Sequence, residues 1–180
     1  MSVLPLLPDR PDDPDLRAMF DEVTARWPHV PNLYRVLGHS PDMLRAWLDM
    51  AWPLRLKPTT SRRLRELIIL HLARSVRSGY EWAHHVPLAL EAGVLQSEID
   101  TLETGHVPDS LAPAEKAALA VAGEIAIGPE ATPAAMAGLE PHFDPSEIVE
   151  IVLTASFYVC VARVIGSLQV PLEERHKAPW

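Results

Sequence analysis

The amino-acid sequence predicts an all-α fold, a single domain of about eight helices. Apolar residues recur at helical spacing in several separate stretches of the chain. Cap residues followed by proline precede many of these stretches, as expected for helix starts. No alternating run of β-branched residues bounded by hairpin turns occurs, so no strand is predicted.

In the first part of the chain, residues 1–12 are rich in Pro and Asp and predict an extended arm before a domain over residues 13–180. Asp13 as cap and Pro14 in the first turn begin a helix that ends near residue 27. A short helix over residues 32–37 follows. Ser40-Pro41 begins the next one, and Pro53 and Pro58 bracket the connector after it.

The second half follows the same logic. A helix begins at Thr60 or Ser61, and Gly79 ends it, because glycine readily adopts the left-handed conformation. A helix over residues 80–92 contains Pro87 and is closed by Gly93. Helices then begin at 97, 113 and 132, and the longest runs from 145 to about 167, after the cap signal Asp144-Pro145-Ser146-Glu147.

Composition excludes several classes of function. The net charge of −8 and the pI near 5.4 leave no broad basic surface, so no nucleic-acid partner is expected. Cys160 is the only cysteine, which rules out a disulfide within the chain, and it is expected to be a small buried hydrophobe. The start lacks a signal peptide, and no apolar run approaches the roughly 18 residues that span a bilayer. A cytoplasmic protein without a membrane partner is therefore expected.

The most informative stretch runs from Glu66 to His85. Glu81 and His85 are four residues apart and project from one face of a predicted helix. A carboxylate beside an imidazole is a plausible proton-transfer pair. His84 faces about 100° away from His85, so the two cannot both point into one small pocket without distortion.

Other interpretations of these residues stay open. Ser78-x-x-Glu81 is a capping box, so Glu81 could fold back onto the Ser78 amide. His85 could be a satisfied core histidine, as His71 is expected to be. Glu66, Glu81 and His85 do not have the spacing of a recognised zinc pattern, so no metal is expected.

The spacing resembles the carboxymuconolactone decarboxylase family, which includes the AhpD-type alkylhydroperoxidases. Thiol members carry Glu-x11-Cys-x2-Cys-x3-His, and the same frame here holds Glu66, Ser78, Glu81 and His85. The flanking segments 65–70 and 91–99 are also similar to the family. The resemblance implies the AhpD-like helical fold and an oligomer, a dimer, trimer or hexamer of identical subunits.

Both redox cysteines of the family are replaced here, by Ser78 and Glu81. Thiol chemistry needs a thiolate nucleophile and a second thiol to close the disulfide, and neither residue supplies one. The resemblance to the non-thiol branch instead implies cofactor-independent proton transfer on a small carboxylated or lactone substrate, by a lyase or isomerase.

Within this resemblance, His85 is expected to be the acid or base, Glu81 its partner, and Glu66 the group that orients His85. Four further residues are expected to line the substrate site: Ser78, Tyr80, Trp82 and His84. The holder of the substrate carboxylate is expected among three arginines: Arg74, Arg77 and Arg163. Two alternatives remain, a peroxiredoxin-like oxidoreductase with an unusual mechanism and a non-catalytic ligand-binding or scaffold protein.

Overall fold

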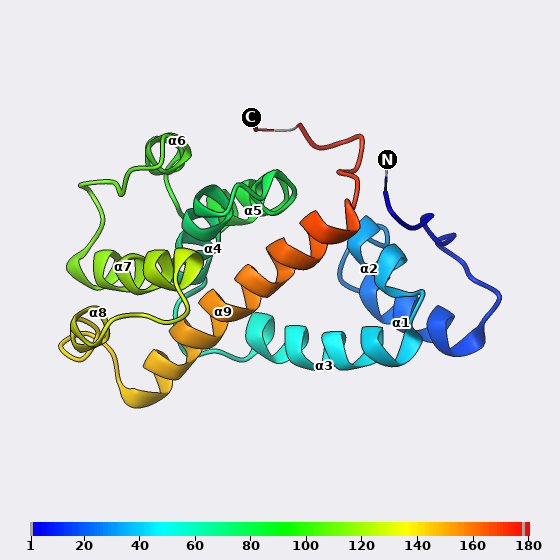
Figure 1. Cartoon of the computed structure of the whole chain (residues 1–180), viewed down its shortest axis with the longest axis horizontal. Helices are drawn as coiled ribbons and strands as arrows, with labels where there is room; N and C mark the ends of the chain where they lie inside the picture. The colour runs from blue at the N-terminus through cyan, green and yellow to red at the C-terminus, as the bar shows by residue number, and fades with distance from the viewer. Residues whose placement is uncertain (1, 178) are drawn as a thin grey trace. The chain divides into compact units, whose positions relative to one another are not determined.

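The computed structural model describes residues 2–177 and 179–180, and this part of the chain contains helices and no strand (Figure 1). The all-α prediction is confirmed. The described helices are α1 (Pro14–Thr24), α2 (Asn32–Leu37), α3 (Pro41–Leu56), α4 (Arg62–Ser75), α5 (Gly79–Glu91), α6 (Gln96–Glu103), α7 (Pro113–Ile127), α8 (Pro133–Ala137) and α9 (Pro145–Leu168).

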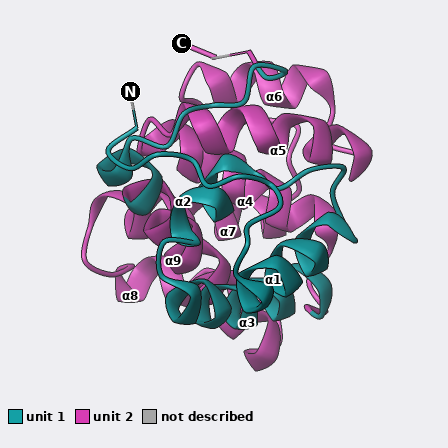
Figure 2. Cartoon of the chain, turned by 90° about the vertical axis from the view of Figure 1, so that its right-hand side faces the viewer, with its two compact units in different colours: residues 1–57, 164–176 teal, residues 58–163, 177–180 magenta. Residues whose placement is uncertain are grey.

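The chain divides into two compact units (Figure 2). Unit 1 combines residues 1–57 with 164–176, and unit 2 combines residues 58–163 with 177–180. Met1, the first residue of the predicted arm, lies outside the described residues. The described arm residues form no helix and contact the rest of unit 1: Arg35 Nε donates to the carbonyl of Leu7 at 2.6 Å. The division into an arm and one domain over residues 13–180 stays a prediction.

Unit 1 has its own hydrophobic core, built from α1, α2 and α3. Asp13 caps α1 by accepting the Leu16 amide at 2.9 Å, as the sequence predicts. The indole rings of Trp27 and Trp52 stack with their centroids 5.2 Å apart. Nine buried side chains make up this core: Leu16, Met19, Phe20, Val23, Val30, Tyr34, Leu44, Leu48 and Trp52.

Two predictions about helix ends are wrong, one at Pro53 and one at Gly79. Helix α3 continues through Pro53 to Leu56, where a connector was expected. Proline removes a single intrahelical hydrogen bond, and buried Trp52 in the same turn anchors the helix by stacking. Likewise, the left-handed residue after α4 is Arg77, with φ of 57°, whereas Gly79 is the first residue of α5.

Helix α9 has the capping box that the sequence predicts. Asp144 Oδ1 accepts the Glu147 amide at 2.9 Å, and Glu147 Oε2 accepts the Asp144 amide at 3.0 Å. Among the described helices, α9 alone is long and apolar enough to cross a membrane, and 50% of its apolar stretch is buried. The expectation that no stretch reaches this length is wrong, because isolated charges such as Glu150 interrupt the apolar run without lowering its mean hydropathy enough. Buried core helices of water-soluble proteins also have this length and composition.

Arg63 connects three elements of unit 2 to α4. Its guanidinium donates to Glu98 at 2.8 and 2.9 Å, to Glu115 at 2.8 Å and to the carbonyl of Gly93 at 2.6 Å. Glu98 and Glu115 in turn accept the Leu95 and Ala112 amides before α6 and α7. Hydrogen bonds from Arg63 lower the pKa of the Glu98 carboxyl. One cation therefore neutralises two carboxylates that also cap helices.

Because His71 of α4 is held in a partly buried position, we expect the stability of unit 2 to fall at acid pH. An ideal Cβ on Gly123 of α7 lies only 2.9 Å from His71 Nε2, so the imidazole packs against that helix. Burial lowers the pKa of His71 below 6.5. The unfolded chain therefore binds the proton first, and the free energy of unfolding falls as the pH drops through 6.5 towards the folded-state pKa.

We expect a His71→Asn variant to lose that part of the pH dependence. Urea unfolding at several pH values between 5 and 8 measures it, and the free energy of the variant should vary less over this range than that of the parent protein. Equal slopes for the two proteins would contradict the assignment.

Candidate functional site

The candidate site of unit 2 is built on a buried carboxylate–imidazole pair between α4 and α5. His85 Nδ1 lies 2.7 Å from Glu66 Oε2, and Glu66 is fully buried while His85 is 6% exposed. Arg62, one turn before Glu66 on α4, forms an ion pair with the other carboxylate oxygen. Ser61 caps α4 by accepting the Leu64 amide at 3.1 Å and so fixes where this turn begins.

The partners of Glu66 determine what His85 can do. An ionised carboxylate only accepts hydrogen bonds, so with Glu66 ionised the hydrogen is carried by His85 Nδ1. In that tautomer Nε2 is the ring atom that accepts a proton, and the carboxylate stabilises the imidazolium that results. The pair is therefore arranged to take up and return a proton at Nε2.

The turn between α4 and α5 fixes the position of Ser78. With Arg77 in the left-handed conformation, the Ser78 amide donates to the Ala73 carbonyl at 2.7 Å and the Arg77 amide to the Arg74 carbonyl at 3.2 Å. This is a Schellman motif, with arginine where glycine is more common. The Ser78 amide is thus already bonded, which removes the reason to interpret Glu81 as a capping-box residue.

Glu81 shares the face of α5 that carries His85. The two residues lie about 40° apart around the helix axis. Glu81 is 3% exposed and Ser78 9% exposed. Glu81 and His85 therefore occupy one buried face of α5, buried Ser78 directly precedes the helix as its N-cap, and Glu66 bonds to His85 on that face.

Tyr158 of α9 also belongs to the site, and sequence reasoning missed it. Its ring meets the His85 imidazole edge-on, with centroids 5.1 Å apart and planes at 88°. Tyr158 is 3% exposed. Because α9 is apolar along most of its length, a polar aromatic residue in its middle was the signal that could have drawn attention to it.

The other predicted lining residues of α5 have different surroundings. Tyr80 and His84 stack on each other at 4.2 Å, and His84 Nδ1 lies 2.8 Å from the Tyr80 carbonyl oxygen. Both project well away from the face of His85. Buried Trp82 meets Trp180 edge-on at 5.2 Å. Their role in substrate binding stays a prediction.

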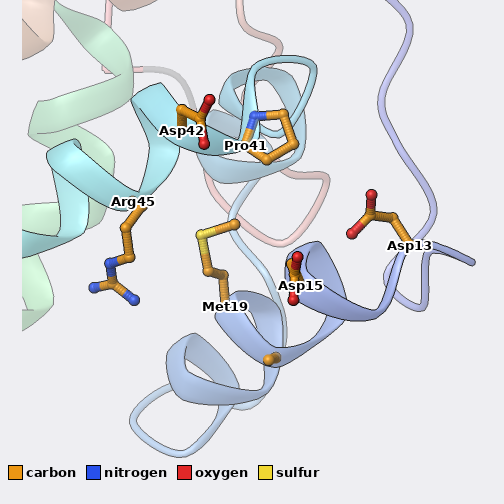
Figure 3. A pocket seen from close by; sticks show the side chains of 7 residues that line it. Asp13, Asp15, Met19, Pro41, Asp42 and Arg45 are labelled. Carbon is orange, nitrogen blue, oxygen red and sulfur yellow. The ribbon is translucent and has the colours of Figure 1, made fainter.

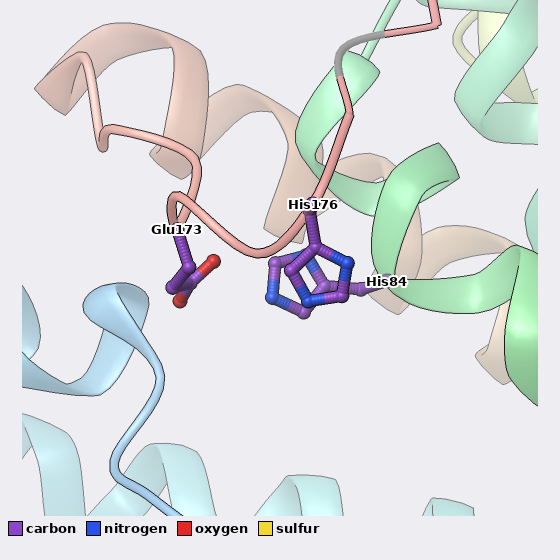
Figure 4. Close-up of side chains that lie close together, drawn as sticks. All are labelled: His84, Glu173 and His176. Atoms are coloured by element: carbon purple, nitrogen blue, oxygen red, sulfur yellow. The ribbon is translucent and has the colours of Figure 1, made fainter.

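The histidines of Figure 4 belong to different units of the chain. His84 projects from α5 of unit 2, whereas Glu173 and His176 come from the C-terminal segment of unit 1. Within unit 1, Glu173 accepts the Asn32 amide at 2.7 Å. This contact gives Glu173 a structural role at the start of α2.

None of the predicted arginines stands beside Glu66 and His85. Arg74 donates to the Glu103 carbonyl at 2.6 Å and covers the Trp180 ring, while Arg77 and Arg163 are exposed. Cys160 is exposed as well, so its predicted burial is wrong. It lies on the solvent side of α9, two residues after buried Tyr158.

Unit 1 contains a cavity of about 350 Å3 that none of the predicted site residues lines (Figure 3). Its walls carry three carboxylates and one arginine, Arg45. Arg45 is bonded to Glu22 at 2.7 Å and to Asp49 at 2.8 Å, so these carboxylates already satisfy its charge.

This helical arrangement is similar to several solved structures over nearly the whole chain. A peroxidase-related protein with an AhpD core, from Ralstonia eutropha JMP134, is 21% identical with a TM-score of 0.81, over 97% of this chain and 93% of that one. A cysteine-to-alanine variant of the debrominase Bmp8, in complex with 2,3,4-tribromopyrrole, is 18% identical with a TM-score of 0.81, over 99% and 96%. A peroxidase-related protein from Silicibacter sp. TM1040 is 18% identical with a TM-score of 0.78, over 97% and 93%.

The fold is therefore the AhpD-like all-α fold. Residues 41–124 match the model of the carboxymuconolactone decarboxylase family, a segment that contains Glu66, Ser78, Glu81 and His85. Within this matched segment both redox-cysteine positions of the family are replaced, by Ser78 and Glu81. No curated protein sequence matches the chain significantly.

Proposed function

We propose that the protein is a lyase or isomerase that transfers a proton on a small carboxylated or lactone substrate at His85. The observation that carries this proposal is the 2.7 Å contact between His85 Nδ1 and the buried Glu66 carboxylate. A carboxylate that orients an imidazole is a recurrent device of general acid–base catalysis. Glu81, on the same face of α5, is the second acid–base group.

A decarboxylation of this kind involves no net oxidation or reduction, so it requires no redox cofactor. The bond between carbon and the carboxylate breaks, CO2 leaves, and the bonding pair passes into the conjugated lactone carbonyl as an enolate. A proton from His85 or Glu81 then returns to carbon, and solvent restores the proton to the protein. For an isomerisation the same groups remove a proton from one carbon and return it to another.

The residues at the family's redox positions disfavour a peroxidase. Ser78 has no thiolate and Glu81 cannot form a disulfide, so the two-thiol cycle has no reacting groups here. The bromopyrrole bound by the debrominase Bmp8 shows that a protein of this fold accommodates a small cyclic molecule. That is the size of substrate the proposal requires.

A Glu81→Gln variant tests the second acid–base group. The amide keeps the shape of the side chain but cannot exchange a proton, so we expect the rate to fall about 100-fold. The candidate substrates are carboxymuconolactone and a panel of lactone carboxylates. For each of them, NMR measures the rates of CO2 release and of solvent-deuterium incorporation.

The matched control is Glu91→Gln, an exposed carboxylate at the end of α5, which should keep full activity. Cys160→Ser should also keep it. An unchanged rate in Glu81→Gln would remove Glu81 from the mechanism, and loss of activity in Cys160→Ser would favour an oxidoreductase.

A further inference from the structure

Arg65 is a buried cation that the proposed chemistry has not yet used. It lies on α4 directly before Glu66 and is 8% exposed. Its Nη1 donates to the Thr60 carbonyl, and no carboxylate among the described residues comes within ion-pair distance of its guanidinium. Because a buried charge is normally paired, Arg65 is an unusual residue to keep in the interior.

The surroundings of Arg65 place it against α9. Thr60, which accepts its hydrogen bond, donates its own amide to Glu150 Oε2 of α9 at 2.9 Å. The carboxylates of Glu150 and Glu66 attract the Arg65 guanidinium, while the neighbouring cation Arg62 repels it. Burial nevertheless dominates and lowers the pKa of the guanidinium, so these groups do not compensate its loss of hydration.

Thr154 of α9 is the second polar group without a compensating contact. It is 2% exposed, and its Oγ1 has no hydrogen-bond partner among the described residues. On α9 it lies one turn after Glu150 and one turn before Tyr158, on the same face as both. Glu150 contacts the residue that holds Arg65, and Tyr158 contacts His85, so Thr154 lies on α9 between the two contacts.

We infer that Arg65 and Thr154 form an anion-binding site that holds the carboxylate of the substrate beside the Glu66–His85 pair. The guanidinium supplies the charge and its remaining N–H donors, and the Thr154 hydroxyl donates to the same carboxylate. The site selects substrates that carry a carboxylate over neutral lactones. The inference rests on the proposed function for the identity of the reacting group, but anion binding requires no turnover.

The test is equilibrium binding of two matched probes to the full chain, measured by calorimetry or ligand-observed NMR. The probes are 5-oxotetrahydrofuran-3-carboxylate and its methyl ester, which share the lactone ring and differ in charge. We expect the carboxylate to bind at least about tenfold more tightly than the ester, since hydrogen bonds to charged groups are the stronger ones.

Arg65→Gln keeps a donor for the Thr60 carbonyl but removes the charge. It should weaken carboxylate binding about tenfold or more and leave ester binding unchanged. Arg65→Lys should retain part of the preference, and Thr154→Val should lower carboxylate affinity several-fold. Circular dichroism checks that each variant is folded. Thr154→Val conserves the volume of the side chain, so this variant tests the anion site even if the Arg65 variants do not fold.

Arg163→Gln, an exposed arginine on the same helix as Thr154, is the matched control and should bind both probes as the parent protein does. His85→Gln should lose turnover yet keep the preference for the carboxylate, so that failure of the proposed chemistry and failure of the anion site are told apart. Equal affinity of the parent protein for the two probes, or full carboxylate affinity in Arg65→Gln, would overturn the inference.

Discussion

Replacement of His85 by glutamine is expected to lower turnover by about 100- to 10,000-fold, the range in which a positioned acid or base contributes. Glutamine still offers an amide donor towards Glu66, so the carboxylate keeps a hydrogen bond and the fold should be retained. What disappears is the ring nitrogen that accepts and returns the proton. The rate of CO2 release or of deuterium incorporation into the substrate measures the loss.

The matched control for this variant is His142→Gln, an exposed histidine in the turn before α9. It should keep the full rate and the same pH profile. A His85→Gln variant that retains its rate would rule out His85 as the proton-transfer group.

Replacement of Arg63 by methionine is expected to cost the fold about 3–5 kcal/mol, the range for removing one partner of a buried ion pair. The side chain of Glu98 is 4% exposed and would keep its charge without a cation. Methionine conserves the aliphatic stem of Arg63, so the loss comes mainly from the charge and the hydrogen bonds. Urea unfolding followed by circular dichroism measures the difference.

Arg45→Met in unit 1 is the matched control for Arg63. Arg45 also pairs with two carboxylates, but its side chain is 39% exposed, so its removal should cost at most about 1 kcal/mol. The Glu98 contribution is present above pH 4.5 and is lost as the pH falls through the lowered pKa of the folded state. Equal losses in the free energy of unfolding for the two variants would show that Arg63 contributes no more to stability than the exposed Arg45 does.

Local signals in the sequence account for most of the helices. Asp13 and the Asp144–Glu147 box begin helices where predicted, because capping depends on residues within one turn. The errors arise where tertiary contacts overrule local preference. Trp52 keeps α3 helical past Pro53, and the Schellman turn places Arg77 in a conformation that favours glycine.

The candidate site could be predicted only along the helix that carries most of it. Glu81 and His85 follow from a spacing of four residues, whereas the bond from Glu66 to His85 joins two helices and followed from the family resemblance alone. Tyr158 and Thr154 come from a helix some seventy residues further on, and their approach depends on how α9 packs. No sequence pattern fixes that packing.

The most direct test of the central claim is a crystal structure of the protein with a carboxylated lactone bound. We expect the reacting carbon, or the oxygen attached to it, within about 3 Å of His85 Nε2. The substrate carboxylate should lie between Arg65 and Thr154, and the Glu66–His85 hydrogen bond should be intact. A lactone bound out of reach of His85, with Glu66 and His85 separated, would contradict the account.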